Sequence, residues 1–320
     1  MRKARGVRAP NLSAILVGYN EASEVYVKNK IRACKFPVLK IKKFMLNRGH
    51  EILKKLAILT GVDIDLIRLP ESCTQKQLHE KINQLNQSDR VDGIIVQLPL
   101  PPQLNQELAT SQVHWTKDVD GFHPFNIGRL ALGDKSFVPA TVSGIVTLID
   151  HEIGINWLRH KNICIVGRSN HICKPLEMWL QNSALSKRPG ADATVTIVHE
   201  ETPDNMVIDK LLQADMIITA TGRNEQWLIG DYIKDGAIII DVAFNRCQDT
   251  GKLFGDCDYE SCNGIASLIT PVPGGVGPLT VSELVKNTII ASTRTHKINS
   301  SIGKDYFLED DTVDYDMKFY

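Results

Sequence analysis

Two groups of residues in this 320-residue chain have types and spacings that could do chemistry. In the first group, Tyr26 and Lys30 stand four residues apart in a segment with a helical pattern, so both face one way. Such a pair is often an ordinary surface contact. Here Gln97 follows an apolar run and could bond an ammonium, while KDVDGF at 117–122 adds two carboxylates in a loop. A lysine among these neighbours could act as base or acid.

The second group could bind a dinucleotide. The segment IVGRS at 165–169 predicts a strand that ends in a turn before a helix, and such a turn suits a pyrophosphate. Gly167 is the one glycine of the usual fingerprint that is present, so an ordinary strand–helix turn is an equal alternative. Glu200 ends the next predicted strand, where a carboxylate binds ribose hydroxyls and repels a 2′-phosphate, which favours NAD over NADP. Arg168 favours the opposite preference, because a guanidinium can pair with phosphate.

Further candidates stand at the carboxyl ends of predicted strands, where open α/β sheets bind ligands. Thr221 and Val242 follow two such strands. The stretch TPVPGGVGPLT at 270–280 holds three glycines and three prolines, so its backbone could approach a flat ligand closely.

The elements that must position these residues are those of two α/β domains. Apolar runs of strand length alternate with helical patterns, which predicts βαβ units and parallel sheets. The predicted strands form two groups separated by the polar segment 99–144. They are Leu12–Val17, Ile64–Leu69 and Gly93–Leu98, and then Asn162–Val166, Thr194–Val198, Met216–Ala220 and Ala237–Asp241.

We therefore expect a catalytic domain at 1–143, a Rossmann-like dinucleotide-binding domain at 144–279, and a cleft between them. The apolar spacing in Val281–Ser292 predicts a helix, within 280–294, that packs back on the first domain. The tail 295–320 lacks such spacing.

Composition excludes several classes of function. Lys+Arg 37 against Asp+Glu 37 argues against a nucleic-acid partner, and the absence of an 18-residue apolar run argues against a membrane partner. Seven scattered cysteines without a CxxC pair fit neither a zinc site nor a disulfide framework, and favour a reducing compartment. The start MRKARGVRAP has four basic residues and no acid, which suits either an organelle-targeting remnant or a solvated terminus.

The chain resembles one family, the bifunctional methylenetetrahydrofolate dehydrogenase/methenyltetrahydrofolate cyclohydrolases. The resemblance rests on YVKNK, VQLPLP, KDVDGF, VGRS and TPVPGGVGPLT, and covers residues 10–34 and 60–294. It implies an enzyme of one-carbon metabolism that oxidises 5,10-methylenetetrahydrofolate to 5,10-methenyltetrahydrofolate with NAD(P)+. The same enzyme would hydrolyse that product to 10-formyltetrahydrofolate.

The resemblance also implies roles for the matching residues. Lys30 would be the lysine of the hydrolysis, with Tyr26 packed on the folate and Gln97 bonded to the lysine. Asp120 would hold the pterin ring. The folate site would also include Leu98, Pro273, Gly274 and Gly275, and the dinucleotide site Gly167, Arg168, Ser169, Glu200, Thr221, Val242 and Thr280.

The segments at 139–141 and 188–197 look most like the mitochondrial, NAD-preferring branch. That likeness implies tetrahydrofolate derivatives as ligands, a homodimer, a mitochondrial location with a cytoplasmic alternative, and assistance to NAD by Mg²⁺ and phosphate. Asp192 matches a metal residue of the branch and Arg168 a phosphate residue.

The chain also departs from the family pattern. A second phosphate-binding arginine is replaced by Glu200, and Val142 and Ser143 replace the usual residues before Gly144. The segment 33–61 is longer than in the family, with a basic stretch at 35–55, and we do not find the further strand and helix with which the family begins. Two alternatives therefore stay open, a dehydrogenase for another small substrate and a folate- or dinucleotide-binding relative without full activity.

Overall fold

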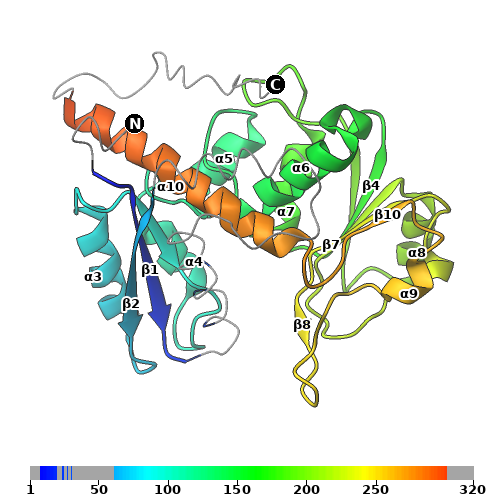
Figure 1. Cartoon of the computed structure of the whole chain (residues 1–320), viewed down its shortest axis with the longest axis horizontal. Helices are drawn as coiled ribbons and strands as arrows, with labels where there is room; N and C mark the ends of the chain where they lie inside the picture. Colours follow the sequence, from blue (N-terminus) through cyan, green and yellow to red (C-terminus); the bar gives the residue numbers. More distant parts are fainter. Residues whose placement is uncertain (1–7, 20–23, 25–26, 28–29, 31–60, 301–320) are drawn as a thin grey trace.

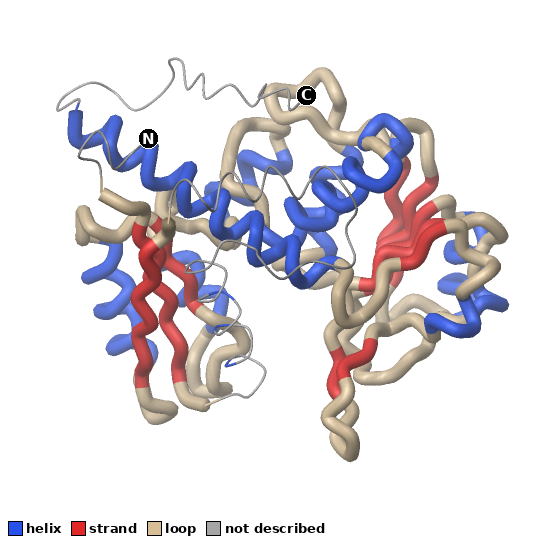
Figure 2. Tube along the Cα trace, viewed as in Figure 1, coloured by secondary structure: helices blue, strands red, loops and turns tan. Residues whose placement is uncertain are grey.

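The computed structural model describes residues 8–19, 24, 27, 30 and 61–300 (Figure 1). Tyr26, the basic stretch 35–55, most of the predicted helix 22–34 and the tail beyond 300 lie outside the described residues. Figure 2 shows the three-stranded sheet separate from the five-stranded sheet and its neighbouring hairpin, as the two-domain prediction requires.

The first sheet contains three parallel strands in the order β2-β1-β3. Strand β1 (Asn11–Val17) is central and buried along its whole length, which explains its nearly continuous apolar sequence. Strand β2 (Asp63–Leu69) lies at an edge, and β3 (Gly93–Val96) at the other. Helices α3 (Gln75–Asn86) and α4 (Gln106–Gln112) add Leu78, Ile82 and Ala109 to the core of this domain.

The second sheet has five parallel strands in the order β10-β7-β6-β4-β5. Alternate strand residues face opposite helix layers: Ile163 and Ile165 pack with α6 and α7, while Cys164 and Val166 pack with α8 and α9. The strands are β4 (Asn162–Val166), β5 (Thr194–Val198), β6 (Met216–Thr219), β7 (Ile238–Asp241) and β10 (Leu268–Ile269), and the helices are α6 (Ala140–Ile153), α7 (Cys173–Gln181), α8 (Asp204–Gln213) and α9 (Tyr259–Cys262).

Helix α10 (Val276–Ser300) connects the two domains, and Figure 1 shows it crossing from the second sheet to the first. Its residues Leu284 and Ala291 share a core with Leu12 and Ile95 of the first sheet, as the predicted return of this helix requires. It also lies against α6, where Gly144 approaches so closely that an added Cβ would meet Thr280 N at 3.0 Å.

Several sequence expectations need correction in detail. Strand β3 ends at Val96 rather than at residue 98, and α10 begins at Val276, inside the glycine-rich segment. The segment 99–144 contains α4, α5 (Pro124–Ala131) and the start of α6, so a boundary after residue 143 falls inside a helix. The domain limits and the cleft between the domains stay predictions. Strand β10 and the hairpin β8 (Asn245–Arg246) with β9 (Leu253–Phe254) were too short to predict.

Both sheets share one arrangement at their centres. In each, the first strand along the chain lies between the second and the third: β1 between β2 and β3, and β4 between β5 and β6. At such a point the connections that follow two neighbouring strands lead to opposite sides of the sheet. Ligands of open α/β sheets bind there, at the carboxyl ends of the strands. Each domain therefore has one favoured binding edge.

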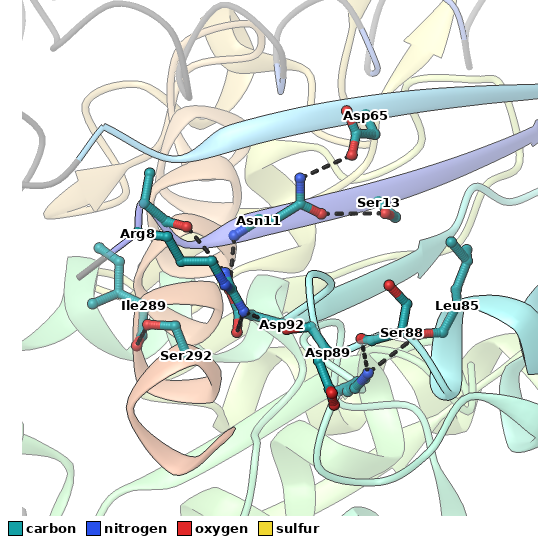
Figure 3. A network of polar contacts seen from close by, with 12 residues as sticks. Arg8, Asn11, Ser13, Asp65, Leu85, Ser88, Asp89, Asp92, Ile289 and Ser292 are labelled. Carbon is teal, nitrogen blue, oxygen red and sulfur yellow. Dashed lines mark hydrogen bonds and ion pairs between the residues drawn. The ribbon is translucent and has the colours of Figure 1, made fainter. Parts of the chain in front are cut away.

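A polar network closes the opposite edge of the first sheet (Figure 3). Arg8 donates two hydrogen bonds to Asp92, from Nη1 to Oδ2 at 2.7 Å and from Nη2 to Oδ1 at 2.9 Å. The same carboxylate accepts from the Asn11 amide at 2.8 Å, and the Asn11 side chain reaches Asp65 of β2 at 2.8 Å. These bonds fix the amino ends of all three strands and leave their carboxyl ends for a ligand. Among the described residues, each helix is too short or too polar to span a bilayer.

Candidate active site

Lys30 and Gln97 meet at the carboxyl end of the first sheet. Lys30 Nζ donates to Gln97 Oε1 at 3.2 Å, and each residue is only 8% exposed. The Gln97 amide group donates from Nε2 to Leu98 O at 2.7 Å, which turns its oxygen toward the lysine. Its backbone N–H bonds Ile15 O at 2.9 Å, so β1 and β3 set the position of the glutamine.

Lys30 lies on the buried face of a helical segment. Glu24, Val27 and Lys30 are helical, spaced by three residues, and buried, so they share one face. Glu24 forms an ion pair with Arg68 of β2, with Arg68 Nη2 donating to Oε2 at 2.9 Å. This pair anchors the buried face six residues, or nearly two helical turns, before the lysine.

The KDVDGF loop is held by the residues around Asp120. Lys117 Nζ donates to the carbonyls of Leu85, Asn86 and Ser88 at the end of α3, at 3.2, 2.8 and 2.8 Å. Cations suit this end of a helix, where carbonyls lack partners. Lys117 therefore fastens the loop to α3.

Asp118 shapes the turn from inside. Its carboxylate accepts from the amides of Phe122 and His123 at 3.1 and 2.8 Å, and from Asn126 Nδ2 at 2.8 Å. Burial raises the pKa of Asp118 to about 6, although these hydrogen bonds favour the charged form. Asp118 is thus a structural residue of the loop.

Asp120 is the second carboxylate of the loop, and its charge interacts with that of Lys30. It is half-buried, and burial raises its pKa, while the charges of Lys30 and His171 lower it. Gly121, which follows, has φ 76°, and an added Cβ would lie 2.6 Å from Pro139 N. A glycine is required there, because only a residue without Cβ lets the loop turn so closely under Asp120.

The turn after β4 lies at the favoured edge of the second sheet. Gly167 has φ 127°, and an added Cβ would meet Ala220 O at 2.6 Å, so the chain passes very close to β6. Ser169 Oγ accepts from the amides of Ile172 and Cys173, both at 3.2 Å, and so caps the start of α7. Those amides are not available to a pyrophosphate. The amides of residues 168–171 donate to no residue that the structure describes, so they are the amides of this turn that could donate to phosphate oxygens.

Arg168 and Glu200 form an ion pair at this edge. Arg168 donates from Nε at 3.0 Å and from Nη2 at 2.5 Å to Glu200 Oε1, and both side chains are largely exposed. The hydrogen bonds from Arg168 lower the pKa of Glu200. The two residues that favoured opposite cofactors are therefore in contact.

Two buried carboxylates, which sequence analysis did not select as site residues, hold the next two strand ends. Asp256 Oδ2 accepts from the Thr221 amide at 2.9 Å. Asp241 accepts from Thr219 Oγ1 at 3.2 Å and from the Cys257 amide at 2.9 Å, and burial raises its pKa to about 6. Val242 donates to Thr219 O at 2.9 Å. An acid that ends a buried strand, as in AIIID, is a signal that could have found Asp241.

The glycine-rich segment continues from the same edge. Thr270 Oγ1 accepts from the Asp241 amide at 2.8 Å, and Gly275 donates to Pro271 O at 2.9 Å. Pro273 and Gly274 are exposed, and Gly274 has φ 122°, which favours glycine. Thr280 already lies in α10, where its Oγ1 is 3.5 Å from that of Thr141.

Residues of the second domain touch the KDVDGF loop and α4 of the first. The His171 ring packs edge-on against Phe122, with centroids 4.4 Å apart and planes at 67°. Asn170 Nδ2 donates to Glu107 Oε1 of α4 at 3.2 Å. The turn after β4 thus reaches the KDVDGF loop.

Comparison with known proteins decides the family. The catalytic-domain profile of the tetrahydrofolate dehydrogenase/cyclohydrolases matches residues 50–120, and the NAD(P)-binding-domain profile matches residues 139–296. The chain belongs to the tetrahydrofolate dehydrogenase/cyclohydrolase family. It is 40% identical to the bifunctional protein FolD of Lactococcus lactis over 292 residues, 91% of this chain and 90% of the relative. It is 42% identical to the mitochondrial bifunctional methylenetetrahydrofolate dehydrogenase/cyclohydrolase 2 of Mus musculus over 293 residues, 90% of this chain and 79% of the relative.

Solved structures of this family have the same fold. The 5,10-methylenetetrahydrofolate dehydrogenase of Bombyx mori matches with TM-score 0.78 and 35% identity, covering 92% of this chain and 91% of that one. The family resemblance and the two-domain α/β fold expected from the sequence are therefore confirmed.

Asp192 is not prepared as a metal ligand in this member of the family. Its Oδ1 accepts from the Ala184 amide at 3.2 Å, and its Oδ2 lies 3.5 Å from Arg159 Nε. Within the described ranges, no group of three or more His, Cys, Asp or Glu side chains could hold a metal ion. With Arg168 also engaged by Glu200, these residues do not fit the magnesium and phosphate pair.

The structure thus brings most of the predicted site residues to the two favoured edges. Lys30, Gln97 and Leu98 lie at the edge of the first sheet, and Gly167–Ser169, Glu200, Thr221 and Val242 at that of the second. His171, Asp241 and Asp256 were missed. Asp192 contacts none of the other predicted site residues among those described.

Proposed function

We propose that this protein oxidises 5,10-methylenetetrahydrofolate to 5,10-methenyltetrahydrofolate with NAD(P)+ and hydrolyses the product to 10-formyltetrahydrofolate. The observation that carries the proposal is the buried contact between Lys30 and Gln97 at 3.2 Å, beside Asp120. The family assignment supports the same two reactions.

The oxidation needs positioning more than acid–base chemistry. A bound nicotinamide supplies the hydride acceptor. The amides of residues 168–171 and the exposed backbone of Pro273 and Gly274 would hold and orient the dinucleotide and the folate. Asp120 would accept hydrogen bonds from the pterin ring. None of these roles requires the lysine.

The hydrolysis needs proton transfer, and Lys30 is the group placed for it. Water attacks the cationic methenyl carbon, and the ring opens after a proton has moved from oxygen toward nitrogen. Lys30 Nζ would carry that proton. Its ammonium group donates a hydrogen bond to Gln97 Oε1, and Asp120 adds a negative charge nearby. Gln97 thus acts by orienting the lysine. The role of Tyr26, on the folate, rests on the family resemblance.

We further propose that NAD is preferred to NADP. Glu200 lies at the end of β5, where ribose hydroxyls bind, and a carboxylate repels a 2′-phosphate. The ion pair with Arg168 also occupies the cation that would otherwise attract that phosphate. For the same reason we expect magnesium and phosphate to have little effect on the reaction with NAD.

Assembly and location complete the proposal. We expect a homodimer from the family resemblance, which light scattering on the purified protein tests. A mitochondrial location is favoured by the mouse relative's name and by the basic start of this chain, with a cytoplasmic location as the alternative. A fluorescent fusion with and without residues 1–10 distinguishes the two.

Two assays test the activities directly. Reduction of NAD with methylenetetrahydrofolate, with and without magnesium and phosphate, measures the first reaction. Loss of methenyltetrahydrofolate absorbance in the absence of dinucleotide measures the second. Binding of either ligand without turnover would instead support the inactive relative, and turnover of another small substrate alone would support the other dehydrogenase.

A further inference from the structure

We propose that His171 is a positioning residue of the folate site, delivered by the dinucleotide domain, and that its protonated form competes with the folate for Asp120. The proposal rests on the proposed folate chemistry and adds a residue to that site. It makes folate binding dependent on pH through a group outside the folate-binding domain.

The geometry places His171 against the turn that contains Asp120. The imidazole packs on the edge of Phe122, with ring centroids 4.4 Å apart, and Phe122 is two residues from Asp120 in a tight turn. The ring and the carboxylate interact electrostatically. A histidine is the one side chain whose ordinary pKa places its change of charge near neutral pH.

A second contact holds the histidine at this place. Asn170 donates from Nδ2 to Glu107 Oε1 at 3.2 Å, and its own Oδ1 accepts from Lys174 Nζ at 2.7 Å. The lysine fixes which end of the amide points to Glu107. The turn is therefore fastened to α4 at one residue and to the KDVDGF loop at the next.

The charges around His171 come from three elements. Glu107 of α4 and Asp120 of the loop favour the imidazolium, while partial burial disfavours it, and burial is the largest effect, so the pKa of His171 is lowered. The charge of Lys30 lowers the pKa of the Asp120 carboxyl. Arg168 and Lys174 on the histidine's own segment are paired with Glu200 and Asn170.

A competition follows from this arrangement. At neutral pH the imidazole is uncharged, and Asp120 is available to hydrogen-bond donors of the pterin. As the pH falls, the imidazolium attracts the same carboxylate, so the folate must displace it. Because linkage is reciprocal, a bound folate must in turn hold His171 in the neutral form.

The test compares His171→Phe and His171→Ala with the parent protein. Phenylalanine keeps an aromatic edge against Phe122 but removes the charge, whereas alanine removes both. Between pH 7.5 and 5.5 the KM for the folate should rise more in the parent than in His171→Phe. The difference should be smaller than the roughly tenfold that a competing group with the ordinary histidine pKa would give, because burial lowers the pKa of His171. Because the charge of His171 lowers the pKa of Asp120, the carboxyl does not titrate identically in the two proteins, and the NMR comparison with Asp120→Asn separates its contribution. The melting temperature of His171→Phe should match that of the parent.

A measurement that needs no turnover separates this proposal from the proposed function. The NMR resonance of His171, assigned by its loss in His171→Phe, should titrate at lower pH in Asp120→Asn than in the parent. Equal titration in the two proteins, or equal pH dependence of KM in the parent and His171→Phe, would overturn the proposal. Absence of turnover in the parent at pH 7.5 would overturn the proposed function. The NMR titration would still show whether His171 interacts with Asp120.

Discussion

Arg168 and Glu200 are joined by two hydrogen bonds that end on one carboxylate oxygen, at 3.0 and 2.5 Å. Their contact follows from strand register. Strands β4 and β5 pair in parallel from Asn162 with Thr194 to Val166 with Val198, and the same offset brings Arg168 opposite Glu200. Neighbouring strand ends thus place a cation and an anion where the adenosine ribose is expected.

This ion pair predicts the effect of Glu200→Ser on cofactor choice. Removing the carboxylate ends its repulsion of a 2′-phosphate and frees Arg168 to attract it. The ratio of kcat/KM for NAD to that for NADP should fall by about fivefold or more. Glu201→Ser is the matched control, since Glu201 is an exposed neighbouring acid with no ion pair to Arg168. An unchanged ratio in Glu200→Ser would mean that Glu200 does not face the ribose.

Lys30→Met should separate the two activities. Methionine preserves most of the buried volume but carries no proton, so hydrolysis of methenyltetrahydrofolate should be lost while much of the dehydrogenase rate remains. Both rates are measured on the same preparation, with Lys76→Met on the exposed face of α3 as control. If a folded variant with normal ligand binding lost both rates, the assignment of Lys30 would be wrong.

Asp256→Asn should weaken dinucleotide binding. Both oxygens of the buried carboxylate accept hydrogen bonds, one from Thr221 N at 2.9 Å and the other from Asn245 Nδ2 at 3.3 Å. The NH₂ group of an asparagine would replace one of these oxygens and could not accept the hydrogen bond. We expect a stability loss of about 1–3 kcal/mol and a higher KM for NAD. Hydrolysis of methenyltetrahydrofolate should change little, because it needs no dinucleotide. Urea unfolding and the two assays measure the three effects, and an unaltered KM for NAD would argue against this role of Asp256.

Stability should depend on pH through Asp118 and Asp241. Burial raises the pKa of each to about 6, so the folded protein holds these protons when the unfolded chain has released them. Each group therefore lowers stability as the pH rises from about 4 to about 6, by about 2–3 kcal/mol. In urea titrations across this interval, Asp118→Asn should show a stability that falls less steeply with pH than that of the parent. Parallel curves for the two proteins would contradict the prediction.

The sequence predicted the sheets because strands buried on both faces leave nearly continuous apolar runs. A hydrogen bond between Gln97 and Lys30 was also expected, from the family resemblance and from the placement of Gln97 after a strand. The capping of α7 by Ser169 was not predicted, since it depends on the local turn geometry, in which the amides of Ile172 and Cys173 donate to that hydroxyl.

The contacts that the sequence did not reveal depend on how segments far apart in the sequence pack together. His171 touches Phe122 across a sequence separation that no periodicity records, and its neighbours Asn170 and Lys174 look like ordinary solvated residues. Asp256 lies on the short connection between β9 and α9, and its bond to Thr221 depends on the fold of that connection. Such contacts require the packed structure.

Helix α10 joins the glycine-rich segment to the core of the first sheet through one continuous helix. The helix starts within the glycine-rich segment and is continuous to the core that contains Leu12 and Ile95. At a rise of about 1.5 Å per residue it is about 37 Å long, so a tilt of about 5° at its start moves its far end by about 3 Å. Because the helix also packs along α6, a rearrangement at Gly274 and Gly275 cannot shift the first domain without disturbing that packing as well.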